Sequence, residues 1–212
     1  MNAHPHPPRR ALIVIDVQNE YFAGGNLPIE FPPVADTLPR IAQAMDAAHA
    51  AGVPVVVVQH TAPVGAPVFD KATDRWQLHP EVARRHADHR IEKNLASAFT
   101  NTGLANWLAE RGIDTLTVVG YMTHNCDAST IYEASHRGLA VELLTDATGA
   151  LPYANAAGRA SAEEIHRVFS VVFHSNFAAA VSTADWVAAM QAGQPLAKDN
   201  VFASNLRARQ TA

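Results

Sequence analysis

Short, uninterrupted apolar runs recur along this chain and alternate with longer segments of helical periodicity. The runs are Ala11–Ile15, Pro54–Val58, Leu116–Val119 and Leu139–Leu144, with a shorter one at Ala179–Ser182. Runs of this length without polar alternation are typical of strands buried on both faces of a parallel sheet. The helical segments cover about 34–51, 101–111, 124–137, 156–176 and 184–192. Strands that alternate with helices predict an α/β fold, in which helices cover both sides of a parallel sheet.

The composition is typical of one globular domain and excludes several other classes of protein. Of the 212 residues, 48% are apolar and 17% are charged, and the net charge is -4. The chain is too apolar and too weakly charged to be disordered, and it lacks the basic field of a nucleic-acid binder. We expect a single domain over residues 10–200, with residues 1–9 and 203–212 as flexible tails.

The sequence also indicates the cellular compartment of the protein. No apolar stretch approaches the roughly 18 residues of a membrane span, and the first residues lack the apolar region of a secretory signal. The single cysteine, Cys126, excludes a disulfide within the chain. We therefore expect a cytoplasmic protein that has no membrane partner.

Polar residues follow two of the predicted strands, at the edge of the sheet where α/β proteins bind ligands. Asp16 follows the first strand directly, where a carboxylate needs a partner because its burial is costly. Asp16 is either a structural residue that accepts hydrogen bonds from backbone N–H groups of the next loop or a catalytic residue. Cys126 stands where the strand ending at Val119 has turned into a helix, and helix N–H groups lower a thiol pKa. An inert buried cysteine is the alternative.

A lysine closes the longest connection of the chain. Segment 60–93 is long and irregular, as functional loops often are, and it ends at Glu92-Lys93. A lysine between a carboxylate and a thiol would keep both ionised by Coulomb attraction. A solvated surface lysine is the alternative interpretation of Lys93.

These residues and their surroundings resemble the isochorismatase-like cysteine hydrolase superfamily. The motifs that carry the resemblance are Leu12–Phe22 with Gly24, Gly25 and Leu27 after it, Glu92-Lys93 with Ser97–Phe99, Val118–Cys126, and Thr145–Ala147. The resemblance spans about Ala11 to Val187. It implies a three-layer α/β/α fold with a six-stranded, mostly parallel, Rossmann-like sheet.

The resemblance also implies a reaction. Members of the family cleave a C–N bond of a small amide, carbamoyl, ureido or lactam substrate. Cys126 would be the nucleophile, Asp16 the general base and then the general acid, and Lys93 the charge that stabilises them. The family has a cis peptide bond at the position of Tyr121–Met122, beside an oxyanion hole formed by the N–H groups of Met122 and Cys126.

Aromatic residues near these positions are candidates for the walls of a substrate pocket. They are Tyr21, Phe22, Trp76 and Tyr121. Ordinary core positions are the alternative for each of them. His124 and Asn125, beside the candidate nucleophile, can contact substrate or cap the helix.

A metal site is not expected. Nicotinamidases, one branch of this superfamily, hold a metal with an Asp-x-His pair, but here Val58 stands in place of the aspartate. His60 and His79 remain, and two imidazoles without a carboxylate make a poor site. We therefore predict no metal, no cofactor and a substrate other than nicotinamide.

Two further functions stay open. One is an isochorismatase-type vinyl-ether hydrolase, a branch that does not require the cysteine, so that Cys126 argues against it. The other is a non-catalytic homologue that uses Cys126 as a thiol sensor. We also expect a homo-oligomer, a dimer or tetramer, because Trp107, Trp186 and Phe-rich helices supply much apolar surface and the family is commonly oligomeric.

Overall fold

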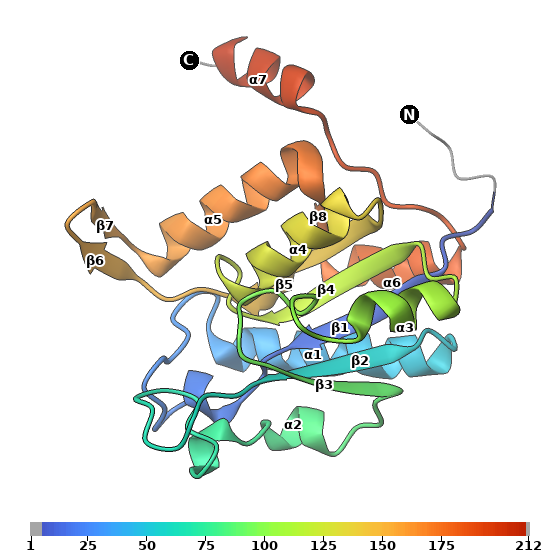
Figure 1. Cartoon of the computed structure of the whole chain (residues 1–212). Coiled ribbons are helices and arrows are strands. Elements are labelled where there is room, and N and C mark those ends of the chain that lie inside the picture. Colours follow the sequence, from blue (N-terminus) through green and yellow to red (C-terminus); the bar gives the residue numbers. More distant parts are fainter. Residues whose placement is uncertain (1–5, 211–212) are drawn as a thin grey trace.

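The computed structural model, which describes residues 6–210, has a sheet of six parallel strands between two layers of helices (Figure 1). The strands are β1 (Arg10–Ile15), β2 (Val55–His60), β3 (His89–Lys93), β4 (Thr115–Tyr121), β5 (Ala140–Gly149) and β8 (Ala179–Val181). They lie in the order β3-β2-β1-β4-β5-β8, and every neighbouring pair is parallel. The predicted three-layer α/β/α fold is confirmed.

Helices bury both faces of this sheet. One layer holds α1 (Val34–Ala50), α2 (Pro80–Ala83) and α6 (Thr183–Gln191); the other holds α3 (Leu104–Glu110), α4 (Cys126–His136) and α5 (Ala162–Val172). Each layer of helices encloses one hydrophobic core against the sheet. Along β1, Leu12 and Val14 belong to the first core, under α1 and α6, and Ile13 and Ile15 belong to the second core, under α3 and α4. Because both sides of the strand are buried, its sequence is continuously apolar.

Two strand regions differ from the expectation. β3 lies at the end of the segment expected to be irregular, and only Ile91 and Lys93 of its residues are buried. Its alternating pattern reflects its position at the edge of the sheet. Strands β6 (Tyr153–Asn155) and β7 (Gly158–Ala160) form an antiparallel hairpin where the long helix was expected to begin. That helix, α5, begins only after a capping box of Ser161 and Glu164, and a π-helical segment, Phe173–Phe177, continues it.

The C-terminal segment also differs from the expected tail. Residues Val201–Gln210 form a helix, α7, which has no buried side chain and extends away from the body of the molecule (Figure 1). Residues 1–5 and 211–212 of the expected tails lie outside the described residues. Within residues 6–210, no helix is both long and apolar enough to cross a membrane.

A buried ion pair ties the amino ends of three strands together. The Arg10 guanidinium donates to both carboxylate oxygens of Glu142, with Nη2 at 2.8 Å from Oε1. Glu142 also accepts hydrogen bonds from the Thr117 hydroxyl at 2.7 Å and from the Trp186 indole at 3.0 Å. Since each partner is satisfied, this network fixes β1, β4, β5 and α6 to one another at the end of the sheet opposite the polar residues.

At their carboxyl ends, β1 and β4 approach each other closely. Gly120 pairs with Ile15 and has a φ of 118°. A Cβ atom at Gly120 would lie 2.1 Å from the Ile15 carbonyl oxygen, so no side chain fits there. The order of strands reverses between β1 and β4, which makes this the switch point at which open α/β sheets bind ligands.

Candidate active site

Three polar side chains that are far apart in the sequence meet at this switch point. Asp16 follows β1, Lys93 ends β3, and Cys126 begins α4 after β4. Lys93 Nζ lies 2.7 Å from Asp16 Oδ2 and 3.2 Å from Cys126 Sγ. The Asp16 and Lys93 side chains are fully buried. The structure therefore brings the candidate base, cation and nucleophile into contact.

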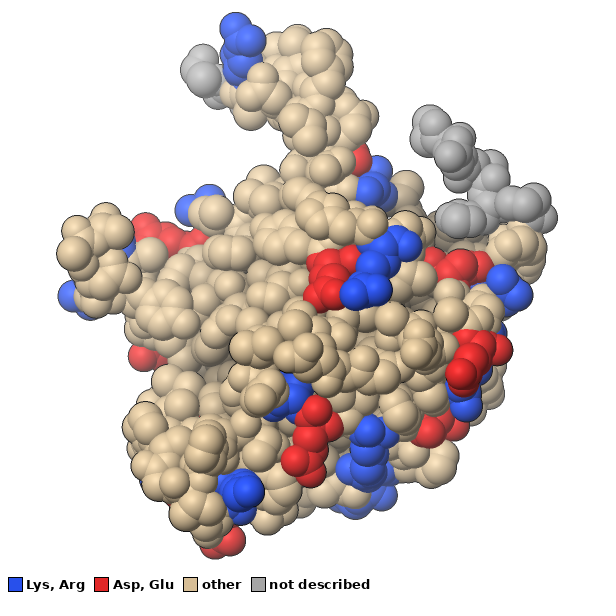
Figure 2. Space-filling model, in the orientation of Figure 1, with Lys and Arg blue, Asp and Glu red and all other residues tan. Residues whose placement is uncertain are grey.

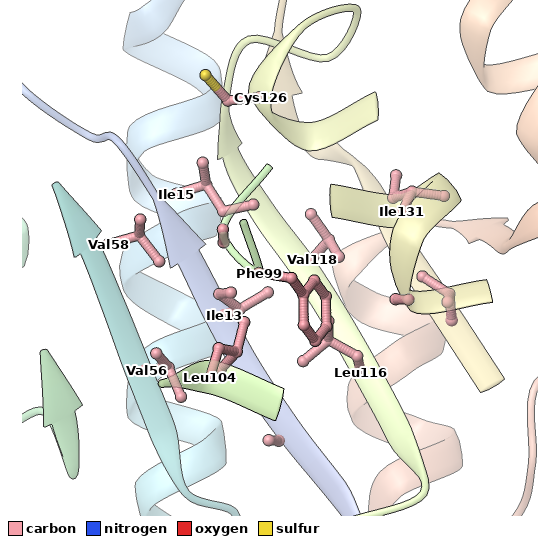
Figure 3. Close-up of a cluster of buried hydrophobic side chains, with 14 of the residues drawn as sticks. Ile13, Ile15, Val56, Val58, Phe99, Leu104, Leu116, Val118, Cys126 and Ile131 are labelled. Carbon is pink, nitrogen blue, oxygen red and sulfur yellow. The ribbon is translucent and has the colours of Figure 1, made fainter. Parts of the chain in front are cut away.

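The local backbone explains where Asp16 and Cys126 point. Asp16 has a φ of 51°, a left-handed conformation that aspartate tolerates better than most residues, and its N–H donates to the Val58 carbonyl. Figure 3 shows the Cys126 sulfur beyond the carboxyl ends of the strands, pointing away from the apolar side chains of Ile13, Val118 and Leu116. The sulfur is thus next to the second core but not enclosed by it.

The thiol pKa differs from the expectation. Burial raises the pKa of Cys126 well above its usual value, and the nearby Asp16 carboxylate raises it further. Lys93 acts in the opposite direction without reversing the shift. The predicted lowering by the helix N-terminus is therefore wrong, because removal of the thiolate from water outweighs it. A thiol held in this state needs a base at the moment of attack, and Asp16 is the adjacent one.

Lys93 stays charged in this setting. Burial alone lowers its pKa, but the Asp16 carboxylate and the Cys126 sulfur raise it, and the net shift is upward. The ammonium also donates to the Leu95 carbonyl at 3.2 Å and to His60 Nδ1 at 3.1 Å. All its partners are acceptors, so Lys93 is a fixed positive charge rather than a proton donor to substrate.

Backbone donors converge on the same place. The Tyr121–Met122 peptide bond is cis. Within the described part of the chain, the N–H groups of Met122 and Cys126 have no hydrogen-bond acceptor, and both residues line one cavity. Two free N–H groups beside a thiol can stabilise an oxygen that becomes negative during attack on a carbonyl.

His60 joins this cluster from the end of β2. Burial and the Lys93 charge lower the pKa of His60, although Asp16 opposes them, so the imidazole is neutral at neutral pH. Because Lys93 only donates, Nδ1 accepts and the ring proton is on Nε2. Ligand atoms of Asp16, His60 and Cys126 lie within 4.8 Å of one another, a spacing that a metal could span. The Lys93 ammonium already contacts all three, and a metal ion would have to displace it.

The cavity beside Cys126 is small and mostly apolar. Its volume is about 300 Å³, and its walls come from loops that follow different strands. The lining residues are Tyr21, Leu27, His60, Val68, Phe69, Ala96, Met122, Asn125, Cys126 and Tyr153. Asn125 is the N-cap residue of α4, but its side chain makes no capping hydrogen bond and is exposed at the cavity.

Of the four aromatic candidates for the pocket, only Tyr21 lines it. Phe22 packs against His79, with ring centroids 4.3 Å apart. The Trp76 indole donates to the Thr61 hydroxyl, and the buried Tyr121 hydroxyl is 2.7 Å from that of Thr37. Tyr121 belongs to the same cluster of buried side chains as Tyr21, with ring centroids 5.5 Å apart, but it does not line the cavity. These three residues therefore have structural roles.

The other two histidines that were left open lie outside the cavity. His79 caps α2, where its Nδ1 accepts from the Glu81 N–H. His124 lies between Tyr153 and Phe169, and burial lowers its pKa to about 4. Neither histidine belongs to the cluster around Lys93.

Glu20, which the sequence did not single out, holds the wall of the cavity in place. Its buried carboxylate accepts from the N–H of Asn26 at 2.6 Å and from that of Phe69 at 2.8 Å. It thus fixes the 61–79 connection to the turn that carries Tyr21. A lone glutamate in a polar turn has no spacing signal that could have revealed this role.

A second buried acid lies beside the nucleophile. Burial raises the pKa of Asp127 to about 7, although a hydrogen bond from Thr148 acts in the opposite direction. Thr148 contacts the Thr123 hydroxyl at 2.9 Å, and Thr123 contacts His166 Nδ1 at 3.2 Å. This chain of polar groups supports the turn before Cys126 without lining the cavity.

Comparison with known proteins adds independent evidence. The family profile described as the Isochorismatase domain matches residues 10–185. Ureidoacrylate amidohydrolase RutB of Acinetobacter baylyi is 30% identical over 91% of this chain and 88% of its own length. A nicotinamidase of the same organism is 31% identical over 66% of this chain and 81% of its own length.

Solved structures agree with this assignment. A Burkholderia xenovorans LB400 protein assigned to the isochorismatases is 64% identical, with a TM-score of 0.95 over 97% of this chain and 98% of its own. A cysteine hydrolase of Pseudomonas syringae pv. phaseolicola is 25% identical, with a TM-score of 0.80 over 91% of this chain and all of its own.

Proposed function

Because this chain belongs to the isochorismatase family of hydrolases, we propose that it hydrolyses a C–N bond of a small amide-type substrate through an acyl-Cys126 intermediate. The observation that carries the proposal is the contact of Lys93 with both Asp16 and Cys126, the last of which lines a cavity. Relatives named as amidohydrolases support the bond type. Amide, carbamoyl, ureido and lactam groups all contain a C–N bond of this type.

In the first half of the reaction, Asp16 takes the Cys126 proton as the sulfur attacks the substrate carbonyl. The N–H groups of Met122 and Cys126 stabilise the resulting oxyanion, and each such donor contributes about 3 kcal/mol in well-studied enzymes. Asp16 then gives the proton to the leaving nitrogen, the C–N bond breaks, and a thioester remains on Cys126.

In the second half, Asp16 removes a proton from water, which attacks the thioester carbonyl. The carboxylic acid leaves and the sulfur regains its proton from Asp16. Lys93 keeps its charge throughout. It stabilises Asp16 as a carboxylate before each attack and stabilises the sulfur when that atom carries negative charge.

A panel of small amides assayed for ammonia release tests this proposal. We expect Cys126→Ser and Asp16→Asn to lower kcat by at least 10³-fold, as loss of a nucleophile or its base does in comparable enzymes. A mass increase on Cys126 equal to the acyl group, trapped by rapid acid quench, would identify the intermediate. Cys126→Ala protein that hydrolyses the panel at the wild-type rate would refute the mechanism.

The same variants separate the alternatives. A vinyl-ether hydrolase would act on isochorismate with Cys126→Ala at an undiminished rate. A thiol sensor would show reversible oxidation of Cys126 and no turnover of any amide. The raised thiol pKa disfavours the sensor, because sensor cysteines are usually thiolates at neutral pH.

We also propose that the protein self-associates, though through a surface different from the expected one. Trp186 and Trp107 are buried within the chain and cannot supply it. Among the described residues, most of the large exposed apolar side chains lie instead on two helices: Val168, Val171 and Val172 on α5, and Val201, Phe202 and Leu206 on α7. An isolated helix as short as α7 is marginal in water, so packing against a second copy would stabilise it.

A further inference from the structure

The walls of the cavity beside Cys126 are uncharged. None of the lining residues is an aspartate, glutamate, lysine or arginine, and the His60 imidazole is neutral at neutral pH. The cavity of about 300 Å³ is at the small end of the range for ligand sites, and Phe69, Tyr153 and Met122 give it flat, apolar walls.

The nearest charges cancel each other. The Lys93 ammonium lies 2.7 Å from the Asp16 carboxylate, and both side chains are fully buried. A carboxylate group on a substrate would therefore lose its water of hydration without gaining a cation of its own. It would also meet the negative charge that develops on the Cys126 sulfur.

Among the described lining residues, one buried side-chain polar group has no hydrogen-bond partner. The Tyr21 side chain is 1% exposed, and its hydroxyl makes no hydrogen bond with any described residue. The ring is held between Phe69 and Tyr121, with centroid distances of 5.4 Å and 5.5 Å, so the hydroxyl cannot easily turn to another acceptor. A buried hydroxyl without a partner is costly, and a bound ligand that pairs with it removes that cost.

We infer that this cavity selects uncharged amides, which hydrogen-bond to the Tyr21 hydroxyl, and rejects substrates that carry a carboxylate. This inference rests on the proposed function, in that it names the substrate class of the same site. It separates this chain from any relative whose substrate is an anion. Tyr21 is the specificity-determining residue because it supplies a buried side-chain hydrogen-bonding group that has no partner within the described residues.

The charge preference can be measured without any hydrolysis, because Cys126 is the only cysteine of the chain. Alkylation by iodoacetamide and by iodoacetate gives two rate constants, and their ratio is divided by the same ratio for 2-mercaptoethanol. We expect Cys126 to favour the uncharged reagent by tenfold or more after this correction. A smaller preference, or a preference for iodoacetate, would overturn the inference.

A cation placed in the wall should weaken the preference. Val68→Lys puts an ammonium in the lining, whereas Val64→Lys puts the same charge on a residue of the same loop that is 66% exposed and outside the lining. We expect the corrected ratio to fall at least fivefold in the first variant and to stay at its wild-type value in the second. Equal shifts in both variants would mean that net charge, and not the cavity, sets the preference.

A test of the role of Tyr21 needs two uncharged reagents, of which one can hydrogen-bond and the other cannot. Iodoacetamide carries an amide and 1-iodopropane does not, and both are uncharged. We expect Tyr21→Phe to slow alkylation by iodoacetamide at least fivefold and to leave the rate with 1-iodopropane unchanged. Equal slowing of both would show that Tyr21 only supports the structure, and no slowing would show that its hydroxyl is not used.

These outcomes are independent of the proposed function. If no amide is hydrolysed but the alkylation ratios behave as expected, the proposed reaction fails and the charge selectivity of the cavity stands. If amides are hydrolysed but 4-carbamoylbenzoate is cleaved as fast as benzamide, the reaction stands and the inference fails.

Discussion

Asp127 follows the candidate nucleophile directly, yet it does not line the cavity. Burial raises its pKa to about 7 from an ordinary value of 3.8, and its Oδ1 atom has no hydrogen-bond partner among the described residues. The native state therefore binds this proton more tightly than the unfolded chain does. By linkage, the contribution of Asp127 to stability is greatest below about pH 4 and is lost as the pH rises to about 7.

Asp127→Asn removes this titration and keeps an acceptor for Thr148. Relative to wild type, we expect the variant to gain stability as the pH rises from 4 to 7, by at most about 1.4 kcal/mol per pH unit. Urea unfolding at several pH values measures this. Asp36→Asn, at an exposed position, makes the same charge change and should show no such slope. A flat difference for Asp127→Asn would mean that the carboxyl is ionised in the native state.

For single residues, the sequence predicted the positions of those that the parallel sheet itself fixes. Asp16 and Cys126 stand just after buried strands, so the rule for parallel sheets places them at one edge. Tyr121 was expected to line the pocket but lies outside the lining residues, and the sequence does not show that its hydroxyl pairs with Thr37. Tyr153 was missed because it stands in a two-stranded hairpin that was not predicted from the sequence.

Among the elements, the 61–79 connection is anchored in part by one buried side chain. The Glu20 carboxylate accepts from two backbone N–H groups, one of them that of Phe69 in the cavity wall. Hydrogen bonds to a charged group are each worth about 1.5–3 kcal/mol, so this carboxylate is a strong anchor for the loop.

Glu20→Gln should release the loop, because the amide NH₂ group cannot accept and would face an N–H donor. We expect cleavage by trypsin after Lys71 or Arg75 to become about tenfold faster and KM to rise more than kcat falls. Glu30→Gln, at an exposed glutamate, serves as the control. Wild-type cleavage rates in the Glu20 variant would show that other contacts hold the loop.

The elements were predicted unevenly for a physical reason. Strands β1, β2, β4 and β5 are buried on both faces and are recognisable from their apolar runs alone. β3 is an edge strand whose His-Arg-Ile-Glu-Lys sequence is mostly polar, so only the family resemblance implied a sixth strand. The length of α5 was overestimated because helical periodicity continues through the hairpin residues before it.

At the scale of the whole molecule, the position of α7 is the feature that contacts within one chain explain least, because none of its side chains is buried. Phe202 is 77% exposed, and the basic residues of α7, Arg207 and Arg209, lie in its last turn. Figure 2 shows uncharged side chains over most of the projecting C-terminal lobe, with basic atoms near its end. Apolar surface on an unsupported helix is typical of a surface that another subunit covers.

Phe202→Asp should therefore convert an oligomer into smaller species. We expect light scattering at micromolar concentration to give a dimer or tetramer for wild type and a monomer for the variant. Asn205→Asp adds the same charge to an exposed position of the same helix and should leave the mass unchanged. A monomeric wild-type protein would contradict the proposal.

The close approach at Gly120 has a consequence for how such a hydrolase can change. Gly120 has no Cβ atom, and this sets the distance between the strand that presents the carboxylate and the strand that leads to the sulfur. Even a methyl group at this position would wedge those two strands apart. Loops around the cavity are thus free to vary with the substrate, whereas the spacing of the reacting groups has no room for adjustment.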